Sequence, residues 1–168
     1  MIKEFLESYV SRGDPVFKLF MKTVECGEPI CLDFTECLSE KGENIILDYY
    51  SGFLIRDQDG KLKIIAAYVD KVKSQEGDLY VVRLSIDIAK RLPEKYLLAL
   101  LAHEIYGHIC TSSDEATAQA STNNLLKALN LPSLDELKNY IVSLARRVKP
   151  RFTDFTIKEE DLVEFEEV

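Results

Sequence analysis

The sequence predicts an α+β domain, in which a small, mostly antiparallel sheet is covered on one face by helices. Apolar residues alternate through the middle of the chain and change to helical spacing near Pro93. A length of 168 residues is typical of one domain. We therefore expect a single domain over 1–168, made of a helical N-terminal piece at 1–24, a sheet at 28–88, helices at 94–148 and an acidic tail at 151–168.

The first half of the chain predicts two short helices followed by strands. Helical spacing over residues 2–10 and 15–24 is interrupted by SRGDP. β-branched and aromatic residues then predict strands at 30–34, 44–50, 53–56, 62–69 and 79–86. The DQDG stretch at 57–60 predicts a hairpin turn rather than a calcium loop, which would need further oxygen ligands.

The second half predicts helices over 94–109, 114–129 and 134–148. In the last of these, Ser133 and Glu136 fit a capping box. Its buried stripe is expected to consist of Leu134, Leu137, Ile141 and Leu144. The tail that follows carries seven acidic residues with phenylalanines between them, which predicts a docked terminal segment. A tail that binds a protein partner or blocks the protein's own site is the alternative.

The charge balance argues against two classes of partner. The net charge is −8 and basic residues form no strong patch, whereas nucleic acids and anionic membranes require clustered Lys and Arg. The longest apolar run, at 96–102, is too short to span a bilayer, and no basic-then-apolar leader opens the chain. We expect a soluble, cytoplasmic protein that binds neither nucleic acid nor membrane.

The four cysteines match no common zinc-binding spacing. Three of them cluster at positions 26, 31 and 37, and Cys110 follows His108 by two residues. In a reducing cytosol we expect them to be small, buried apolar residues. A disulfide is the alternative, because the Lys- and Glu-rich composition with little His or Gln would suit a thermophile, where intracellular disulfides occur.

The only two histidines of the chain, His103 and His108, lie in the apolar stretch LLALLAHEIYGHIC. Their HExxxH spacing is one residue longer than the HExxH signature of zinc peptidases. Residues i and i+5 of an α-helix diverge by about 140°, so a regular helix would leave Glu104 and His108 as the aligned pair. A π-turn, helped by Gly107, would absorb the extra residue and turn both imidazoles toward one metal.

Metal-assisted hydrolysis requires imidazoles to hold zinc, an open position for water and a nearby carboxylate. We predict that His103 and His108 are ligands and that Glu104 is the general base. Glu115 is the leading candidate for the third ligand, because a short TSS turn would bring the next helix close to the histidines. Asp114 is the alternate ligand, and Glu115 also fits a capping box with Ser112.

The segment VVRLSIDIAKRLPEKYLLALLAHEIYGHI, followed by EATAQASTNNLLKALNL, resembles the core of HtpX-like and CAAX-prenyl-type gluzincin peptidases, and its motif is similar to the AHEIGH core of ImmA/IrrE peptidases. The resemblance covers about residues 80 to 130. It differs in the inserted motif residue, a shorter gap between His108 and Glu115, and the lack of the membrane helices of HtpX-like enzymes. The matching positions are Ala102, His103, Glu104, Gly107 and His108, with Glu115 and Ala116 at the third-ligand motif.

This resemblance implies a minimal soluble zincin-like metallopeptidase that acts on a peptide or unfolded polypeptide. We expect the substrate to pair as an extended strand along a sheet edge, at 79–85. Two alternatives remain open. The histidines are structural and hydrogen-bonded at the end of a buried helix, or the protein is a catalytically inactive zincin-like binding or regulatory protein that uses its acidic tail as a contact surface.

Overall fold

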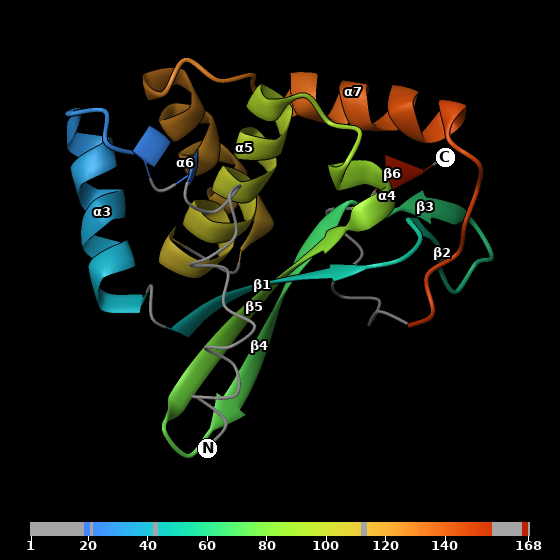
Figure 1. Cartoon of the computed structure of the whole chain (residues 1–168), viewed down its shortest axis with the longest axis horizontal. Helices are drawn as coiled ribbons and strands as arrows, with labels where there is room; N and C mark the ends of the chain where they lie inside the picture. Colours follow the sequence, from blue (N-terminus) through green and yellow to red (C-terminus); the bar gives the residue numbers. More distant parts are fainter. Residues whose placement is uncertain (1–18, 21, 42–43, 112–113, 156–165, 168) are drawn as a thin grey trace.

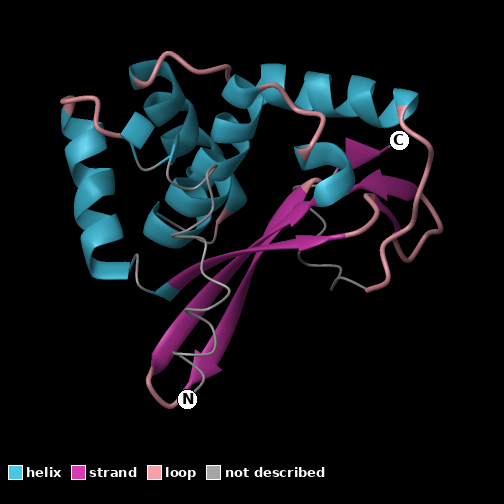
Figure 2. Cartoon of the chain, in the orientation of Figure 1, coloured by secondary structure: helices cyan, strands magenta, loops and turns pink. Residues whose placement is uncertain are grey.

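The structure is a computed structural model that describes residues 19–20, 22–41, 44–111, 114–155 and 166–167. It confirms the α+β class: the helices lie to one side of a twisted three-stranded sheet, and a second small sheet lies beside it (Figure 1, Figure 2). Of the predicted helical piece at 1–24, only positions 19, 20, 22 and 23 are described as helix, and residues 1–18 and 21 lie outside the description.

The main sheet has the strand order β1-β5-β4. Strand β1 (Ile45–Tyr50) runs parallel to β5 (Gly77–Ser85), which pairs antiparallel with β4 (Ala67–Ser74). The prediction that residues 79–85 form an edge for substrate is therefore wrong, because both sides of β5 are already paired. Within the described part of the chain, the outer strands of this sheet are β1 and β4.

The second sheet joins β2 (Leu54–Arg56), β3 (Leu62–Ile64) and β6 (Glu166–Glu167). The predicted DQDG turn is confirmed, since Gly60 donates its backbone N–H to the carbonyl of Asp57 at 3.0 Å and takes a φ of 79° that favours glycine. The single strand expected at 62–69 is instead two strands in different sheets. The chain changes sheet where Ile65 bonds Phe53 and Ala66 bonds Ser85.

The helix α3 (Pro29–Lys41) replaces the strand expected at 30–34. Pro29 takes the first helical position, where its missing N–H leaves no hydrogen bond unmade. Its buried residues Cys31, Phe34 and Leu38 repeat at the spacing of one helix face. The strand prediction was wrong because a short apolar and aromatic run fits either a strand or a buried helix.

The helices after the sheet are largely as predicted. They are α5 (Glu94–Ala102), a π-helix η3 (His103–Thr111), α6 (Glu115–Ala128) and α7 (Leu134–Arg147). The capping box of Ser133 and Glu136 is confirmed. A short helix, α4 (Ile86–Ala89), was not predicted; Ser85 caps it by accepting from the N–H of Ile88. None of the helices that the structure describes combines the length and apolar composition needed to cross a membrane.

The main core lies between the helices and one face of the β1-β5-β4 sheet. Leu47, Val82 and Leu84 point from the strands into it, and the fully buried Leu101 and Ile105 meet them from α5 and η3. Phe155 packs in a smaller cluster, with its ring 5.0 Å from that of Tyr50. The described part of the predicted tail is thus docked, and residues 156–165 and 168 lie outside the description.

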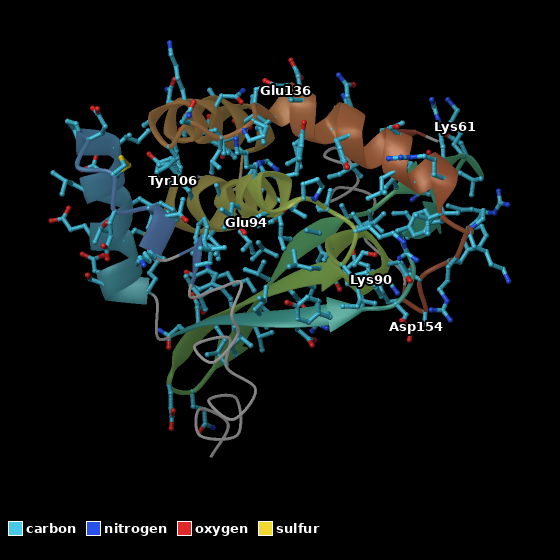
Figure 3. The ribbon with its side chains drawn as sticks, turned by 45° about the horizontal axis from the view of Figure 1, so that its top comes forward. Lys61, Lys90, Glu94, Tyr106, Glu136 and Asp154 are labelled. Atoms are coloured by element: carbon cyan, nitrogen blue, oxygen red, sulfur yellow. A yellow bond between two sulfur atoms is a disulfide. The ribbon has the colours of Figure 1, made fainter. Side chains whose placement is uncertain are left out.

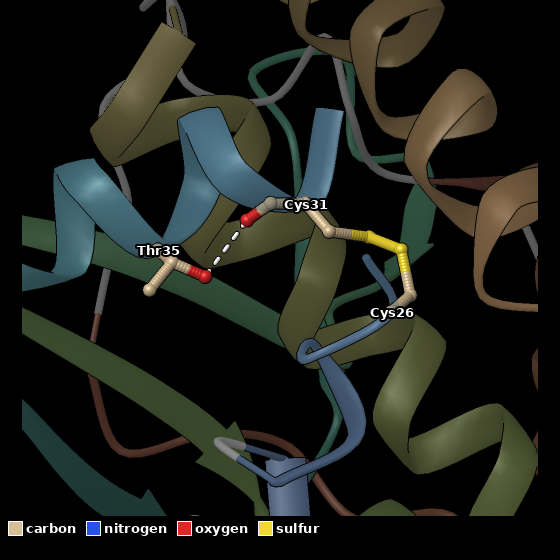
Figure 4. Close-up of a disulfide and its surroundings, with 3 residues drawn as sticks. All are labelled: Cys26, Cys31 and Thr35. Carbon is tan, nitrogen blue, oxygen red and sulfur yellow. Dashed lines mark hydrogen bonds between the residues drawn. A yellow bond between two sulfur atoms is a disulfide. The ribbon is translucent and has the colours of Figure 1, made fainter. Parts of the chain in front are cut away.

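The cysteines form two disulfides, Cys26–Cys31 and Cys37–Cys110, so the expectation of reduced cysteines is wrong. The first closes a short loop at the start of α3, where Thr35 also donates its hydroxyl to the carbonyl of Cys31 at 2.8 Å (Figure 4). The second joins α3 to η3. Its cysteines are 73 residues apart in the sequence.

Candidate metal centre

The predicted departure from α geometry is present and is longer than one turn. Helix α5 ends at Ala102, and the nine residues of η3 that follow form a π-helix. In a π-helix the backbone bonds run from i to i+5, so residues five apart come onto one face. The additional residue of the HExxxH motif is absorbed in this way, and His103 and His108 lie on the same side.

The two imidazoles meet through their Nε2 atoms, which are 3.3 Å apart. Their ring centroids are 4.7 Å apart and the ring planes are inclined by 79°. His103 and the neighbouring Glu104 are buried, with Glu104 only 2% exposed, whereas His108 is partly exposed. Any approach from solvent to the histidine pair therefore comes from the His108 side.

This spacing fits two ligands of one zinc ion. At Zn–N distances of about 2.0–2.1 Å and tetrahedral angles, two ligand nitrogens are separated by about 3.3–3.4 Å. The observed Nε2 to Nε2 distance of 3.3 Å falls in that range. A hydrogen bond between one protonated and one unprotonated nitrogen gives a similar distance, which is the geometry of the alternative with structural histidines.

Among the described side chains, no group of three or more His, Cys, Asp or Glu residues converges as a complete metal site would. Asp114 is the N-cap of α6, so the alternative interpretation of Glu115, a capping box with Ser112, is wrong. The Asp114 carboxylate accepts from the N–H and the hydroxyl of Thr117, and these hydrogen bonds hold its pKa below the ordinary value. Glu115 is the first residue of α6, which packs on η3, and its side chain lies outside the description.

Gly107 has a role in packing that the sequence did not indicate. A side chain at this position would place its Cβ 2.6 Å from the hydroxyl oxygen of Thr122 and 3.2 Å from the carbonyl oxygen of Ala118. Both residues belong to α6. Glycine is thus required because α6 approaches the backbone of η3 closely, next to His108.

Helix α3 supplies contacts to η3 that sequence reasoning missed. Tyr106 lies on the side of η3 that faces α3 (Figure 3), and its ring centroid is 5.0 Å from that of Phe34. Burial raises the pKa of the Tyr106 phenol, and a hydrogen bond with Thr111 opposes this rise. Lys41 donates from Nζ to the carbonyl oxygen of Ile109 at 3.2 Å. Only the helical spacing of Phe34 and Lys41 could have pointed to this face.

Comparison with protein-family models, with curated proteins and with solved structures yields no match for this chain. The resemblance to gluzincin peptidases therefore rests on the motif residues and their surroundings in the sequence.

Proposed function

We propose that the protein is a zinc-dependent metallopeptidase. His103 and His108 hold the metal through Nε2, Glu115 is the third ligand and Glu104 is the general base. The observation that carries this proposal is the 3.3 Å approach of the two Nε2 atoms across a π-helix. In an ordinary α-helix, residues five apart point in different directions. The approach of His103 and His108 therefore depends on the π-helical backbone.

Zinc, when bound, supplies a Lewis acid that makes a water molecule nucleophilic near neutral pH. The Glu104 carboxylate would accept a proton from the attacking water and deliver it to the nitrogen of the leaving amine. Glu104 directly follows His103 in the chain and is 2% exposed, so packing restricts its side chain to few positions. A fixed carboxylate of this kind is what general base catalysis requires.

The proposed substrate is a peptide or unfolded polypeptide bound in extended form along β4. This strand takes the place of β5 in the original expectation, because β4 is an outer strand of the described sheet and contacts η3. Backbone pairing along an edge gives affinity without much dependence on side chains. A substrate held there would run beside the helix that carries His103 and His108.

A cytoplasmic location is part of the proposal and is constrained by the two disulfides. Stable disulfides occur in oxidising compartments and in intracellular proteins of hyperthermophiles. Cytoplasmic action of this protein therefore requires either the cytoplasm of a hyperthermophile or bridges that form reversibly as part of redox sensing. The Lys- and Glu-rich sequence with two histidines agrees with the first of these.

The test is the metal content and peptidase activity of protein purified without a metal-affinity tag. Glu104→Gln should keep zinc and lower the rate of cleavage by about 10²- to 10⁴-fold, since the ligands survive and the proton acceptor does not. His103→Ala and His108→Ala should each lose both zinc and activity. Treatment of wild-type protein with a chelator should abolish cleavage of an unfolded polypeptide, and addition of zinc should restore it.

The peptidase proposal fails if wild-type protein neither retains zinc nor cleaves unfolded polypeptides, and the hydrogen-bonded histidine pair is then the correct description. Zinc that is retained without any cleavage would instead identify a catalytically inactive, zincin-like binding or regulatory protein. In that case the acidic tail becomes the surface to examine for a protein partner.

A further inference from the structure

One face of α3 is attached to residues 106–110 of η3 at three points. Phe34, Cys37 and Lys41 are spaced so that they lie along the same side of the helix. Phe34 contacts the Tyr106 ring, Cys37 is bonded to Cys110, and Lys41 donates to the carbonyl oxygen of Ile109 at 3.2 Å. The contacts are aromatic, covalent and charged, and they all fall within five consecutive residues of η3.

These attachments act on one histidine of the pair and not on the other. His103 follows directly from α5, whose last residues are fully buried in the main core. His108 lies between Tyr106 and Cys110, inside the segment that α3 holds. The position of His108 relative to His103 therefore depends on the conformation of the last turn of η3.

That turn needs external support. Long π-helical segments are rare, and an α-helical turn in the same place would move His108 away from the face of His103. The last carbonyls of a helix also have no partner within the helix, and the Lys41 ammonium group provides one for Ile109. A cation at a helix C-terminus is favourable in addition, because it interacts with the helix dipole.

We propose that α3 is a strut for the metal centre, in which Cys37, Cys110 and Lys41 are positioning residues, and that the Cys37–Cys110 disulfide makes metal affinity dependent on redox state. This inference rests on the proposed metal site of His103 and His108. It adds a regulatory property to that site, since the same ligands bind zinc strongly in the oxidised protein and weakly in the reduced one.

The redox step is a thiol–disulfide exchange with a dithiol protein of the thioredoxin type. One thiolate of the dithiol attacks a sulfur of the Cys37–Cys110 bridge, and its second thiol resolves the mixed disulfide. The dithiol becomes a disulfide, and two electrons and two protons pass to Cys37 and Cys110, which become thiols. Both cysteines are partly exposed, so the bridge is not sealed within the core.

The experiment measures zinc affinity by competition with a chromogenic chelator. Replacing the bridge in Cys37→Ala/Cys110→Ala should weaken binding by about tenfold to hundredfold, the effect expected when groups that orient metal ligands are removed. The matched control is Cys26→Ala/Cys31→Ala, which removes the bridge that lies within α3 and its preceding loop and should leave affinity unchanged. Wild-type protein that is reduced, freed of reductant and kept anaerobic should bind as weakly as the Cys37→Ala/Cys110→Ala variant.

A second pair of variants tests the strut without touching a cysteine. Lys41→Met should weaken zinc binding, and Lys41→Arg should retain it, because arginine also donates to a carbonyl from a charged group. Circular dichroism establishes that each variant is folded at the temperature of the titration. If zinc affinity fell only because a variant is less stable, the Cys26→Ala/Cys31→Ala control would lose zinc affinity as well.

The possible failures are distinguishable. If oxidised wild-type protein binds no zinc, the proposed function itself is wrong. If wild-type protein binds zinc and the folded Cys37→Ala/Cys110→Ala variant binds it equally well, the strut is refuted while the metal site stands. Equal weakening in the Cys26→Ala/Cys31→Ala control, or reduced wild-type protein that binds as tightly as the oxidised form, also overturns the inference.

Discussion

At the scale of single residues, His103, Glu104 and His108 could be found in the sequence because their signal is local. The chain has only two histidines, and their spacing alone required a non-α backbone if they were to act together. The reason for Gly107 could not be found in the same way. It depends on α6, whose Thr122 and Ala118 meet η3 only in the folded protein.

Gly107→Ala should destabilise the protein by about 1–3 kcal/mol, the usual cost of adding a methyl group to a packed interior. The new Cβ would lie 2.6 Å from the Thr122 hydroxyl oxygen, and Thr122 is fully buried. Urea denaturation of Gly107→Ala, Thr122→Ala and the double variant gives the coupling between the two positions. We expect the double variant to recover part of the loss, and a strictly additive result would show that the contact is not the cause.

At the scale of elements, α7 could be predicted from end to end because its signals are all within it. Ser133 and Glu136 mark its start, and Leu137, Ile141 and Leu144 of the predicted stripe are buried. Leu134, the first residue of that stripe, is only partly buried. Helix α3 was mistaken for a strand because its short apolar run has no decisive period. The order of strands in the main sheet, and the bond between Cys37 and Cys110, depend on contacts between distant segments that no local pattern encodes.

The cap of α7 gives a direct test at this scale. Ser133→Ala should lower the free energy of unfolding by about 1 kcal/mol, since the hydroxyl oxygen accepts from the N–H of Glu136 at 3.2 Å. Ser143→Ala is the matched control, because Ser143 is exposed within the same helix. Alanine has the higher helix propensity, so the control should be neutral or slightly stabilising in thermal unfolding. Equal losses in both variants would argue against the cap.

At the scale of the whole molecule, the two disulfides should contribute unequally to stability. In the chain-entropy model a bridge across 73 residues stabilises by about 4 kcal/mol and one across 5 residues by about 2 kcal/mol. Cys37→Ala/Cys110→Ala should therefore unfold at lower denaturant concentration than Cys26→Ala/Cys31→Ala. Guanidinium unfolding of wild type and both variants, monitored by circular dichroism, measures the midpoint of each. A lower midpoint for Cys26→Ala/Cys31→Ala than for Cys37→Ala/Cys110→Ala would contradict the chain-entropy model for this protein.

The parallel pairing of β1 with β5 has a consequence for the path of folding. Ile45 finds its partner only at Tyr80, whereas β2 with β3 and β4 with β5 are hairpins between neighbouring segments. Contacts between distant residues carry a larger loop-closure cost and form more slowly than local ones. During synthesis, the apolar residues of β1 therefore have no strand partner until β5 has emerged from the ribosome. The β4–β5 hairpin forms first, and β1 then pairs with its β5 edge.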